Sequence, residues 1–172
     1  MKKIVWSLLC LVLSLHAEEV YATFTVEAQK SAQLAFNASG IVNKVNVDIG
    51  SVVKEDDVLA TLESNDINAS LQIAHTAFKY AKKDFERQLK VKNIIDQASL
   101  DQYAGKYENA KNQVIYQQAL LDKTILKSPF DGIVFWKEVE IGDTVSGMML
   151  KTVLKLQSRH ARKLVLSFDQ KY

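Results

Sequence analysis

Residues 128–143 read SPFDGIVFWKEVEIGD, and residues 36–51 read FNASGIVNKVNVDIGS. Both stretches contain Gly-Ile-Val followed at the same distance by Val-x-Ile-Gly, and they lie 92 residues apart. Aligned without a gap, residues 40–62 and 132–154 are identical at eight of 23 positions: Gly40/Gly132, Ile41/Ile133, Val42/Val134, Val47/Val139, Ile49/Ile141, Gly50/Gly142, Val53/Val145 and Leu62/Leu154. Two copies are too few for a solenoid, so we expect the copies to pair with each other.

Each copy has the residue pattern of a β-strand with one wet face. Val45, Val47 and Ile49 alternate with polar residues in the first copy, and Val139 and Ile141 do so in the second. Alternation of branched apolar and polar residues predicts a half-buried strand. Further short strands are predicted at 58–62 and 153–156, and the turns that define the fold are assigned to Gly40, Gly50, Gly132 and Gly142. The two halves are expected to close into a small flattened barrel.

The two Gly-x9-Gly copies resemble the biotinyl/lipoyl fold. Ser128-Pro129-Phe130-Asp131-Gly132, which opens the second copy, is similar to the second lipoyl half of periplasmic adaptor proteins. These proteins are also called membrane fusion proteins of tripartite efflux pumps. The resemblance covers roughly residues 34–172. It implies an α+β fold, in which a small lipoyl-like β-barrel is split by an antiparallel α-helical coiled-coil hairpin.

The segment between the copies is predicted to form that hairpin. One apolar seam consists of Ile67, Leu71, Ala74, Phe78, Ala81 and Phe85, and a second consists of Leu100, Tyr103, Tyr107, Ala110, Val114, Gln117 and Leu121. Spacings that alternate between three and four residues are typical of coiled-coil packing. Asp66 and Asp96 are the expected N-caps of the two helices. Each helix is expected to have about 28 residues and a length of about 42 Å.

The length of this insert argues against a carrier protein. In a biotin or lipoyl carrier, the two halves are joined by a tight turn that displays the modified lysine. Here residues 63–127 separate the halves, and no Met-Lys-Met or Asp-Lys-Ala motif lies at the junction. A biotin or lipoyl carrier is therefore the less favoured alternative, to be decided by intact mass.

The expected hairpin tip departs from the motif that the resemblance implies. Adaptors of this family commonly carry Arg-x3-Leu-x6-Ser at the tip, where the hairpin docks to the outer-membrane channel. Leu89 and Asp96 have the Leu-x6-Ser spacing, with Asp in place of Ser, whereas Phe85 occupies the arginine position. Arg87 lies two residues further along the chain. The partner-contact residues implied by the resemblance are thus Arg87, Leu89 and Asp96.

The first residues have the features of a secretory signal peptide. Lys2 and Lys3 precede an apolar run that is too short to span a bilayer. Cleavage is expected after Ala17, with Ala22 as the second choice. Without residues 1–17, the chain has no cysteine and 20 basic against 20 acidic residues. It therefore has neither a disulfide nor the basic character of a nucleic-acid-binding protein.

No enzyme site, cofactor site or metal site is predicted. The histidines do not share the spacing of metal ligands, and Met148 and Met149 are assigned to packing in preference to metal binding. The expected organisation is a signal peptide at 1–17, an N-terminal extended segment at 18–33, lipoyl-like halves at 34–62 and 125–156, a hairpin at 63–124, and the first strand of an incomplete adaptor β-barrel domain at 157–172.

The resulting hypothesis is a periplasmic, C-terminally shortened adaptor that performs no chemistry. It would link an inner-membrane transporter to an outer-membrane channel in the efflux of drugs or other small molecules. The lipoyl-like domains would self-assemble into a homo-oligomer, and the hairpin tip would dock to the channel. Transporter contact is the least supported part, since the adaptor domains that grip the pump are missing from the 172 residues. The sequence does not choose between a proton-driven and an ATP-driven partner.

Overall fold

The computed structural model describes residues 22–91, 93–94, 96–159 and 162–168. The predicted signal peptide and the cleavage site after Ala17 lie outside the described residues, and Ala22, which precedes the second candidate cleavage site, is the first residue described. The described chain forms two compact units, one made of the segments up to Glu27 and from Lys163, and the other made of Ala28–Arg162. Each unit is described by itself.

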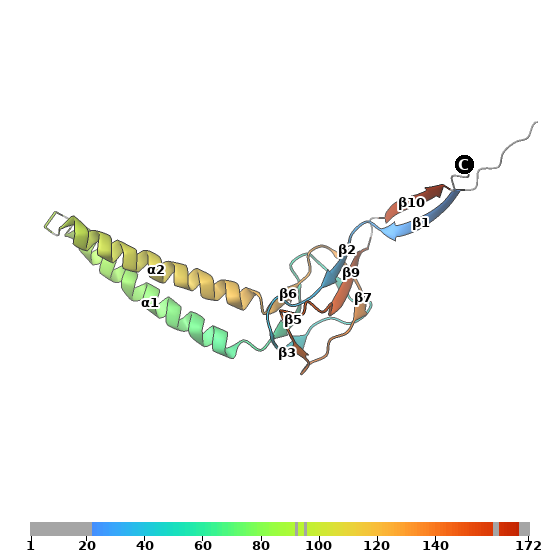
Figure 1. Cartoon of the computed structure of the whole chain (residues 1–172), viewed down its shortest axis with the longest axis horizontal. Coiled ribbons are helices and arrows are strands. Elements are labelled where there is room, and N and C mark those ends of the chain that lie inside the picture. Colours follow the sequence, from blue (N-terminus) through green and yellow to red (C-terminus); the bar gives the residue numbers. More distant parts are fainter. Residues whose placement is uncertain (1–21, 92, 95, 160–161, 169–172) are drawn as a thin grey trace, which may run out of the picture. The chain divides into compact units, whose positions relative to one another are not determined.

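The larger unit contains two four-stranded sheets (Figure 1). The first has the strand order β2-β9-β7-β4, and the second has the order β6-β5-β3-β8, with antiparallel pairing throughout. The strands are β2 (Ser31–Leu34), β3 (Gly40–Val45), β4 (Val52–Val53), β5 (Val58–Leu62), β6 (Ile125–Lys127), β7 (Gly132–Lys137), β8 (Thr144–Val145) and β9 (Leu154–Ser158). The predicted α+β fold, a lipoyl-like barrel split by a helical hairpin, is confirmed.

The two sequence copies bond to each other in matching ways. The Gly50 N–H donates to the Val134 carbonyl at 2.8 Å, and the Gly142 N–H donates to the Val42 carbonyl, also at 2.8 Å. Short strand β4 of the first copy pairs with β7 of the second, and β8 of the second pairs with β3 of the first. The expectation that the copies pair is therefore confirmed, and the barrel is pseudo-two-fold symmetric.

Both sheets contribute one face to a common apolar core. Apolar side chains removed from water on these faces supply the main driving force for closing the barrel. The buried members of this core are Phe36, Val42, Val53, Leu59, Ala60, Leu62, Leu126, Phe130, Val134, Val139, Val153, Leu154 and Leu156.

The strands begin earlier in each copy than the alternating pattern predicts. Residues 46–49 and 139–141 are not strands, because the chain turns away after β3 and β7. Val139 still reaches the core, but Ile49 and Ile141 are 61% and 65% exposed. The prediction that these isoleucines lie on the buried face of a strand is wrong. They stand immediately before the turn glycines, where the chain reverses and their side chains point outward.

The ungapped alignment also fails near its end. Val42 pairs with Leu62 between β3 and β5, whereas the equivalent Val134 pairs with Leu156 between β7 and β9. The structural counterpart of Leu62 is thus Leu156 and not Leu154, since the loop before β9 is longer by two residues. The exposed apolar residues of this longer loop are Met148, Met149 and Leu150. The assignment of the two methionines to packing in the core is wrong.

The insert forms an antiparallel pair of helices, α1 (Asn65–Lys90) and α2 (Gln97–Asp122), which lie side by side (Figure 1). Every residue of the two predicted seams is buried or half-buried. The Tyr107 ring stacks between those of Phe78 and Phe85, with centroid distances of 5.6 and 5.5 Å. In the described part of the chain, no helix combines the length and the apolar character needed to cross a membrane.

The two helices begin differently. The N-cap of α1 is Ser64, and Asp66 lies within the first turn, so the prediction that Asp66 caps this helix is wrong. Its carboxylate still lies near the positive end of the helix dipole, where a negative charge is favourable. The N-cap of α2 is Asp96, whose side chain accepts a hydrogen bond from the Ser99 N–H. This cap is confirmed.

The base of the hairpin is tied into the barrel. Strand β5 leads into α1 and β6 follows α2, and these strands pair with each other with Thr61 opposite Ile125. The Leu62 N–H donates to the Thr124 carbonyl at 2.9 Å, and the buried Thr124 hydroxyl donates to the Leu121 carbonyl at 2.7 Å. Both helices are therefore held at a fixed spacing where they leave the barrel.

The smaller unit is a two-stranded sheet of β1 (Ala22–Ala28) and β10 (Arg162–Phe168). Glu27 and Lys163 form an ion pair across it at 3.0 Å. A strand was expected from Leu164 onward, and its pairing with the N-terminal segment was not anticipated. The segment 18–33, expected to be extended, contributes β1 here and the start of β2 to the larger unit.

Candidate functional site

The hairpin tip combines exposed apolar side chains with a well-formed helix start. Helix α1 ends at Lys90, and the Val91 N–H caps it by donating to the carbonyls of Gln88 and Leu89. Leu89 and Val91 are exposed, and Ile94 is 89% exposed. Removing exposed apolar side chains from water lowers the free energy, so the tip is suited to contact a partner. Val91 and Ile94 were missed from the sequence, although two branched residues in a break between helices were a usable signal.

Arg87 and Leu89 do not form one cluster. Residues two apart on a helix are separated by about 200°, so these side chains leave α1 on nearly opposite faces. Arg87 pairs with the Asp84 carboxylate of the preceding turn and is largely exposed. Leu89 lies outside the seam, whereas Gln88 is half-buried there. Of the predicted tip residues, Leu89 shares the tip with Asp96, and Arg87 belongs to the outer surface of α1.

Asp96 fixes the start of α2. Its carboxylate accepts from the Ser99 N–H at 2.9 Å and from the Ser99 hydroxyl at 2.7 Å. These hydrogen bonds, that from the Ser99 side chain foremost, lower the pKa of Asp96 below its ordinary value. The residue that replaces Ser in the adaptor motif thus performs an N-cap role, and its contact with a partner stays a prediction.

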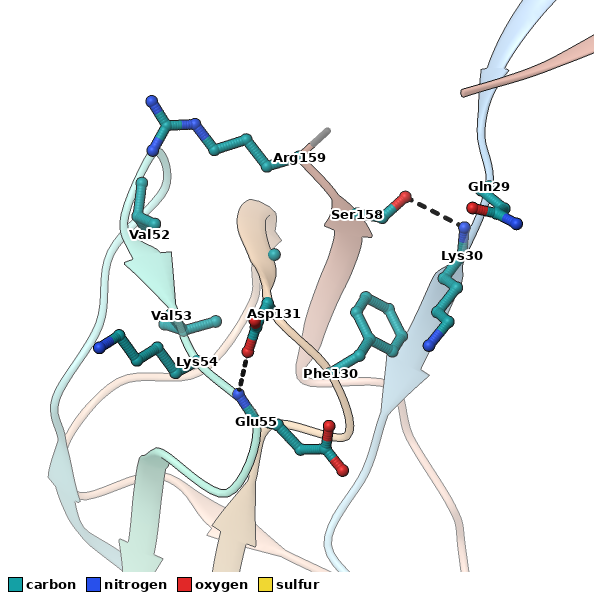
Figure 2. A pocket seen from close by; sticks show the side chains of 11 residues that line it. Gln29, Lys30, Val52, Val53, Lys54, Glu55, Phe130, Asp131, Ser158 and Arg159 are labelled. Atoms are coloured by element: carbon teal, nitrogen blue, oxygen red, sulfur yellow. Dashed lines mark hydrogen bonds between the residues drawn. The ribbon is translucent and has the colours of Figure 1, made fainter. Parts of the chain in front are cut away.

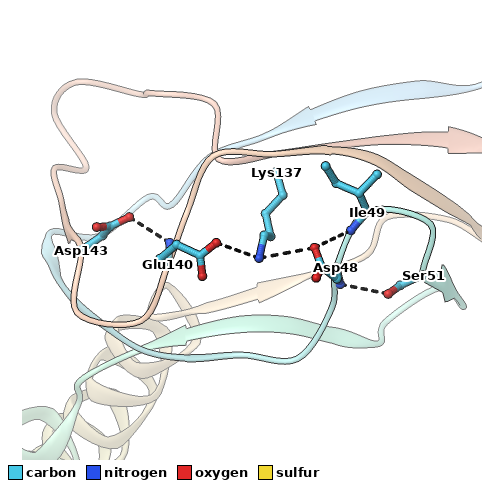
Figure 3. A network of polar contacts seen from close by, with 6 residues as sticks. All are labelled: Asp48, Ile49, Ser51, Lys137, Glu140 and Asp143. Carbon is cyan, nitrogen blue, oxygen red and sulfur yellow. Dashed lines mark hydrogen bonds and ion pairs between the residues drawn. The ribbon is translucent and has the colours of Figure 1, made fainter.

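The turns that follow β3 and β7 line one hollow of the barrel surface and are joined by Lys137, which lies between Asp48 and Glu140 (Figure 3). Gly50 and Gly142 have φ values of +92° and +93°, which favour glycine over residues with a Cβ. The Lys137 ammonium contacts the Glu140 carboxylate at 2.9 Å and the Asp48 carboxylate at 3.4 Å. One cation therefore holds a turn from each copy.

Electrostatics stabilise this three-residue bridge. The pKa of Lys137 is raised, chiefly by its hydrogen bond to Glu140, with the Asp48 charge adding to the effect. The pKa of Asp48 is lowered, first by the hydrogen bond from the Ile49 N–H and then by the Lys137 charge. Asp48 and Lys137 are thus both ionised at neutral pH, so their ion pair joins the two turns under ordinary conditions.

Gly40 and Gly132 occupy the first positions of strands β3 and β7, whereas the sequence assigned them to turns. At Gly132 a Cβ would lie 2.5 Å from the Gln157 carbonyl oxygen, so a close approach of two strands requires this glycine. At Gly40 a Cβ would lie 3.5 Å from Leu62, an ordinary contact. Only the second copy therefore needs glycine here for steric reasons.

Phe130, Asp131 and Gly132 of the Ser-Pro-Phe-Asp-Gly segment line one side of a cavity of about 510 Å³ (Figure 2). The Ser128 hydroxyl donates to the Phe130 carbonyl at 2.7 Å, and Asp131 accepts from the Glu55 N–H at 2.8 Å. On the other side of the cavity, the Lys30 N–H donates to the Ser158 hydroxyl at 3.1 Å (Figure 2). These contacts hold loops of both copies together, and no nucleophile with an adjacent base is among the residues that line the cavity.

The sequence matches the CzcB-like barrel-sandwich hybrid domain family over residues 30–153. The chain belongs to this family. The matched segment runs from just before β2 to just before β9, so it includes both turn glycines and the whole hairpin. The family match thus covers the same paired copies that the sequence repeat marks.

Solved structures with this CzcB-like architecture include efflux and membrane fusion proteins. A candidate efflux transporter from Bacteroides eggerthii is 25% identical with a TM-score of 0.69, and covers 87% of this chain and 46% of its own. A MacA–MexA chimera that contains the Pseudomonas aeruginosa MexA α-hairpin domain is 23% identical with a TM-score of 0.74, covering 81% and 50%. The membrane fusion protein Spr0693 from Streptococcus pneumoniae is 18% identical with a TM-score of 0.66, covering 85% and 66%. The predicted resemblance to membrane fusion proteins is confirmed.

This CzcB-like chain spans only part of the length of its relatives. An uncharacterised protein from Haemophilus influenzae is 23% identical over 129 residues, which is 74% of this chain and 34% of that protein. The Bacteroides eggerthii protein and the MacA–MexA chimera are covered to 46% and 50% of their length. The described domains correspond to the barrel and hairpin portion of such proteins.

Proposed function

We propose that this protein is a periplasmic adaptor that links an inner-membrane transporter to an outer-membrane channel in the efflux of small molecules. The observation that supports it most is the pseudo-symmetric barrel that holds both ends of a helical hairpin with an exposed apolar tip. Membership of the CzcB-like family and the shared fold of membrane fusion proteins point in the same direction.

The barrel suits a structural role and not a carrier role. In a carrier the junction between the two halves is a turn that presents a lysine, and here β5 and β6 continue into the two helices. Barrel residues that bear chemistry, such as Lys137 and Asp131, hold loops together through the contacts described above. The proposed work of this domain is therefore to position the hairpin and to associate with further copies.

The tip suits a contact with helices of a partner. The apolar side chains of Leu89, Val91 and Ile94 are exposed where the hairpin reverses, furthest along α1 and α2 from the barrel. A buried apolar side chain of this size contributes about 1.5–3 kcal/mol on leaving water. Burial of three such side chains is enough to favour docking to a partner without a large permanent interface.

Site-specific crosslinking tests the proposal. A photoreactive or cysteine-directed crosslinker at Ile94 is expected to capture an outer-membrane channel protein in intact cells, and the same crosslinker at Lys123, near the hairpin base, is not. Deletion of the gene is expected to raise the susceptibility of the cells to exported small molecules. Equal capture from both positions, or unchanged susceptibility together with no capture from Ile94, would refute the adaptor role.

A further inference from the structure

The loop between β8 and β9 presents three successive apolar side chains to solvent. Met148 is 94% exposed, Met149 is 76% exposed, and Leu150 is 66% exposed. Scattered exposed apolar residues are normal on a protein surface, whereas a contiguous apolar patch calls for an explanation. This loop is therefore a candidate for a role beyond closing the barrel.

The fold does not require an apolar loop at this place. In the first copy, the equivalent connection runs from β4 to β5, and its residues 54–57 read Lys-Glu-Asp-Asp. Charged residues thus suffice to join the same two strands of the barrel. The methionines of the second copy are not explained by the needs of the turn.

Both ends of the loop are held to the barrel. The Gly147 N–H donates to the Ser39 hydroxyl at 3.0 Å, and a Cβ at Gly147 would lie only 2.9 Å from the Asn37 carbonyl group. At the other end, the Lys151 ammonium contacts the Glu138 carboxylate at 2.8 Å. These anchoring contacts do not use the methionine side chains, so a chemical change at the methionines leaves them in place.

The loop also concentrates the sulfur of the protein. The sequence contains three methionines, Met1, Met148 and Met149, and one cysteine, Cys10. Met1 and Cys10 both belong to the predicted signal peptide. Once that segment is removed, all the sulfur of the chain lies in two adjacent, exposed thioethers.

An exposed thioether is open to attack by oxidants. Oxidation of methionine to the sulfoxide turns a flexible apolar side chain into a polar one, and methionine sulfoxide reductases reverse it. An oxidant must reach the sulfur atom, so a methionine on the surface reacts more readily than one in a packed core. An exported protein also meets external oxidants before they reach the cytoplasm, which the predicted signal peptide makes relevant here.

We propose that Met148 and Met149 form a reversible oxidation site for hypochlorous acid and related two-electron oxidants. In each step the thioether sulfur loses two electrons and gains the oxygen of hypochlorous acid, the chlorine is reduced to chloride, and a proton is released. Two thiols, acting through a methionine sulfoxide reductase, return the thioether and yield one disulfide and one water. This site goes beyond the adaptor role and does not depend on it.

Oxidation at this site changes the surface and spares the core. Both methionines lie outside the apolar cluster that closes the barrel. The sulfoxide oxygen accepts hydrogen bonds from water, so the oxidised loop loses its apolar character. Retention of the protein on a hydrophobic-interaction column is therefore expected to fall after oxidation, while the urea midpoint of unfolding is expected to stay unchanged.

Peptide mapping after titration with hypochlorous acid tests the site. Trypsin cleavage after Lys137 and Lys151 yields a peptide, residues 138–151, that carries both methionines, and the preceding peptide, residues 128–137, carries Trp136. About two equivalents of oxidant, one per thioether, are expected to add up to two oxygen atoms to the first peptide before any reach the second. Treatment with both classes of methionine sulfoxide reductase and a thiol reductant is expected to remove them.

The matched control variant is Met148→Leu/Met149→Leu, which keeps the loop apolar without its sulfur. Its peptide 138–151 is expected to take up no oxygen, and its Trp136 peptide is expected to be oxidised at a lower dose of oxidant than in the unaltered chain. Its column retention is expected to be insensitive to oxidant.

A second control separates exposure from chemical identity. In the same background, Leu156→Met places a thioether at a fully buried position of β9 with little change in volume. This methionine is expected to stay unoxidised at doses that convert the surface pair, and to react once urea unfolds the chain. Leu154→Met, also fully buried, serves the same purpose if the first variant does not fold.

Oxygen confined to peptide 138–151, removed by the reductases and accompanied by an unchanged urea midpoint, supports the proposal. Earlier oxidation of other peptides, a lowered urea midpoint after uptake of two oxygen atoms, or no recovery with the reductases overturns it. Equal reactivity of the buried and the exposed methionines overturns the argument from exposure. Channel capture from Ile94 is measured on unoxidised protein, so each of these outcomes leaves the adaptor proposal to its own test.

Discussion

Replacement of Gly132 by Ala tests how the second copy closes against its neighbouring strand. A Cβ at this position would lie 2.5 Å from the Gln157 carbonyl oxygen and 3.2 Å from the carbonyl carbon. Both are backbone atoms of the paired strand β9 and cannot rotate away. Overpacking of this kind typically costs about 1–3 kcal/mol, so we expect Gly132→Ala to lower the free energy of unfolding by that amount.

Gly40→Ala is the matched control, because Gly40 occupies the same position in the first copy. A Cβ there would lie 3.5 Å from a Leu62 methyl group, an ordinary contact. Gly40→Ala is expected to change the free energy of unfolding by less than about 1 kcal/mol. Because Ala makes the unfolded chain less flexible than Gly does, this change is expected to be a small stabilisation.

Urea unfolding followed by tryptophan fluorescence measures the free energy of unfolding of the barrel in both variants. Trp136 lies in β7, and the Lys155 ammonium is 4.7 Å from the centre of its ring, so its emission is expected to change when β7 and β9 separate. The far-ultraviolet circular dichroism of the hairpin serves as a separate probe. Equal losses in Gly132→Ala and Gly40→Ala, or no loss in Gly132→Ala, would refute the steric argument.

Three further predictions concern the hairpin and the paired turns. Asp96→Ala is expected to lower the thermal midpoint of the helical circular-dichroism signal, whereas Asp96→Asn is expected to retain the cap. Because the pKa of Asp96 is lowered in the folded state, the stability that Asp96 adds relative to Ala is present near neutral pH. This stability is lost as the pH falls through the lowered pKa. Tyr107→Ala is expected to cost about 1–3 kcal/mol for its two ring contacts and Tyr107→Leu less, measured by thermal unfolding. Lys137→Met is expected to speed hydrogen exchange at the Gly50 and Gly142 amides at neutral pH. The effect of Lys137 is expected to disappear as the pH rises through its raised pKa, and the part due to Asp48 is also lost as the pH falls through the lowered pKa of that carboxyl. Unchanged exchange at both amides would contradict the bridging role.

Sequence patterns predict the repeat and the hairpin well because both are periodic over long stretches. Every seam residue from Ile67 to Leu121 is sheltered, since a helix keeps the same face toward its partner for many turns. The strands are short, and their alternation continues into the turns, so Ile49 and Ile141 carry the pattern of core residues while standing in solvent. Periodicity alone does not show where a strand ends.

The strand register of the second copy could not be predicted from the sequence for a different reason. The ungapped identity of Leu62 with Leu154 is fortuitous, because a loop that is longer by two residues moves the true counterpart to Leu156. Leu154 and Leu156 are both buried in β9, so composition does not distinguish them. Only the pairing with Val134 in the folded chain does.

The candidate site shows the same division between local and distant information. Asp96 could be assigned as an N-cap, since a cap depends on residues within one turn. The separation of Arg87 from Leu89 onto opposite faces follows from helix geometry once α1 is known to continue to Lys90. Arg87 and Leu89 were grouped because they lie two residues apart, and closeness along the chain does not show direction around the helix.

The structure assigns different tasks to the two ends of the hairpin. At its base, the pairing of β5 with β6 and the buried Thr124 fix the spacing of the helices. At the tip, the chain reverses through exposed apolar residues with no strand to hold them. A hairpin anchored at the barrel and open at the tip suits the proposed adaptor role, in which the barrel positions the helices and the tip contacts a partner.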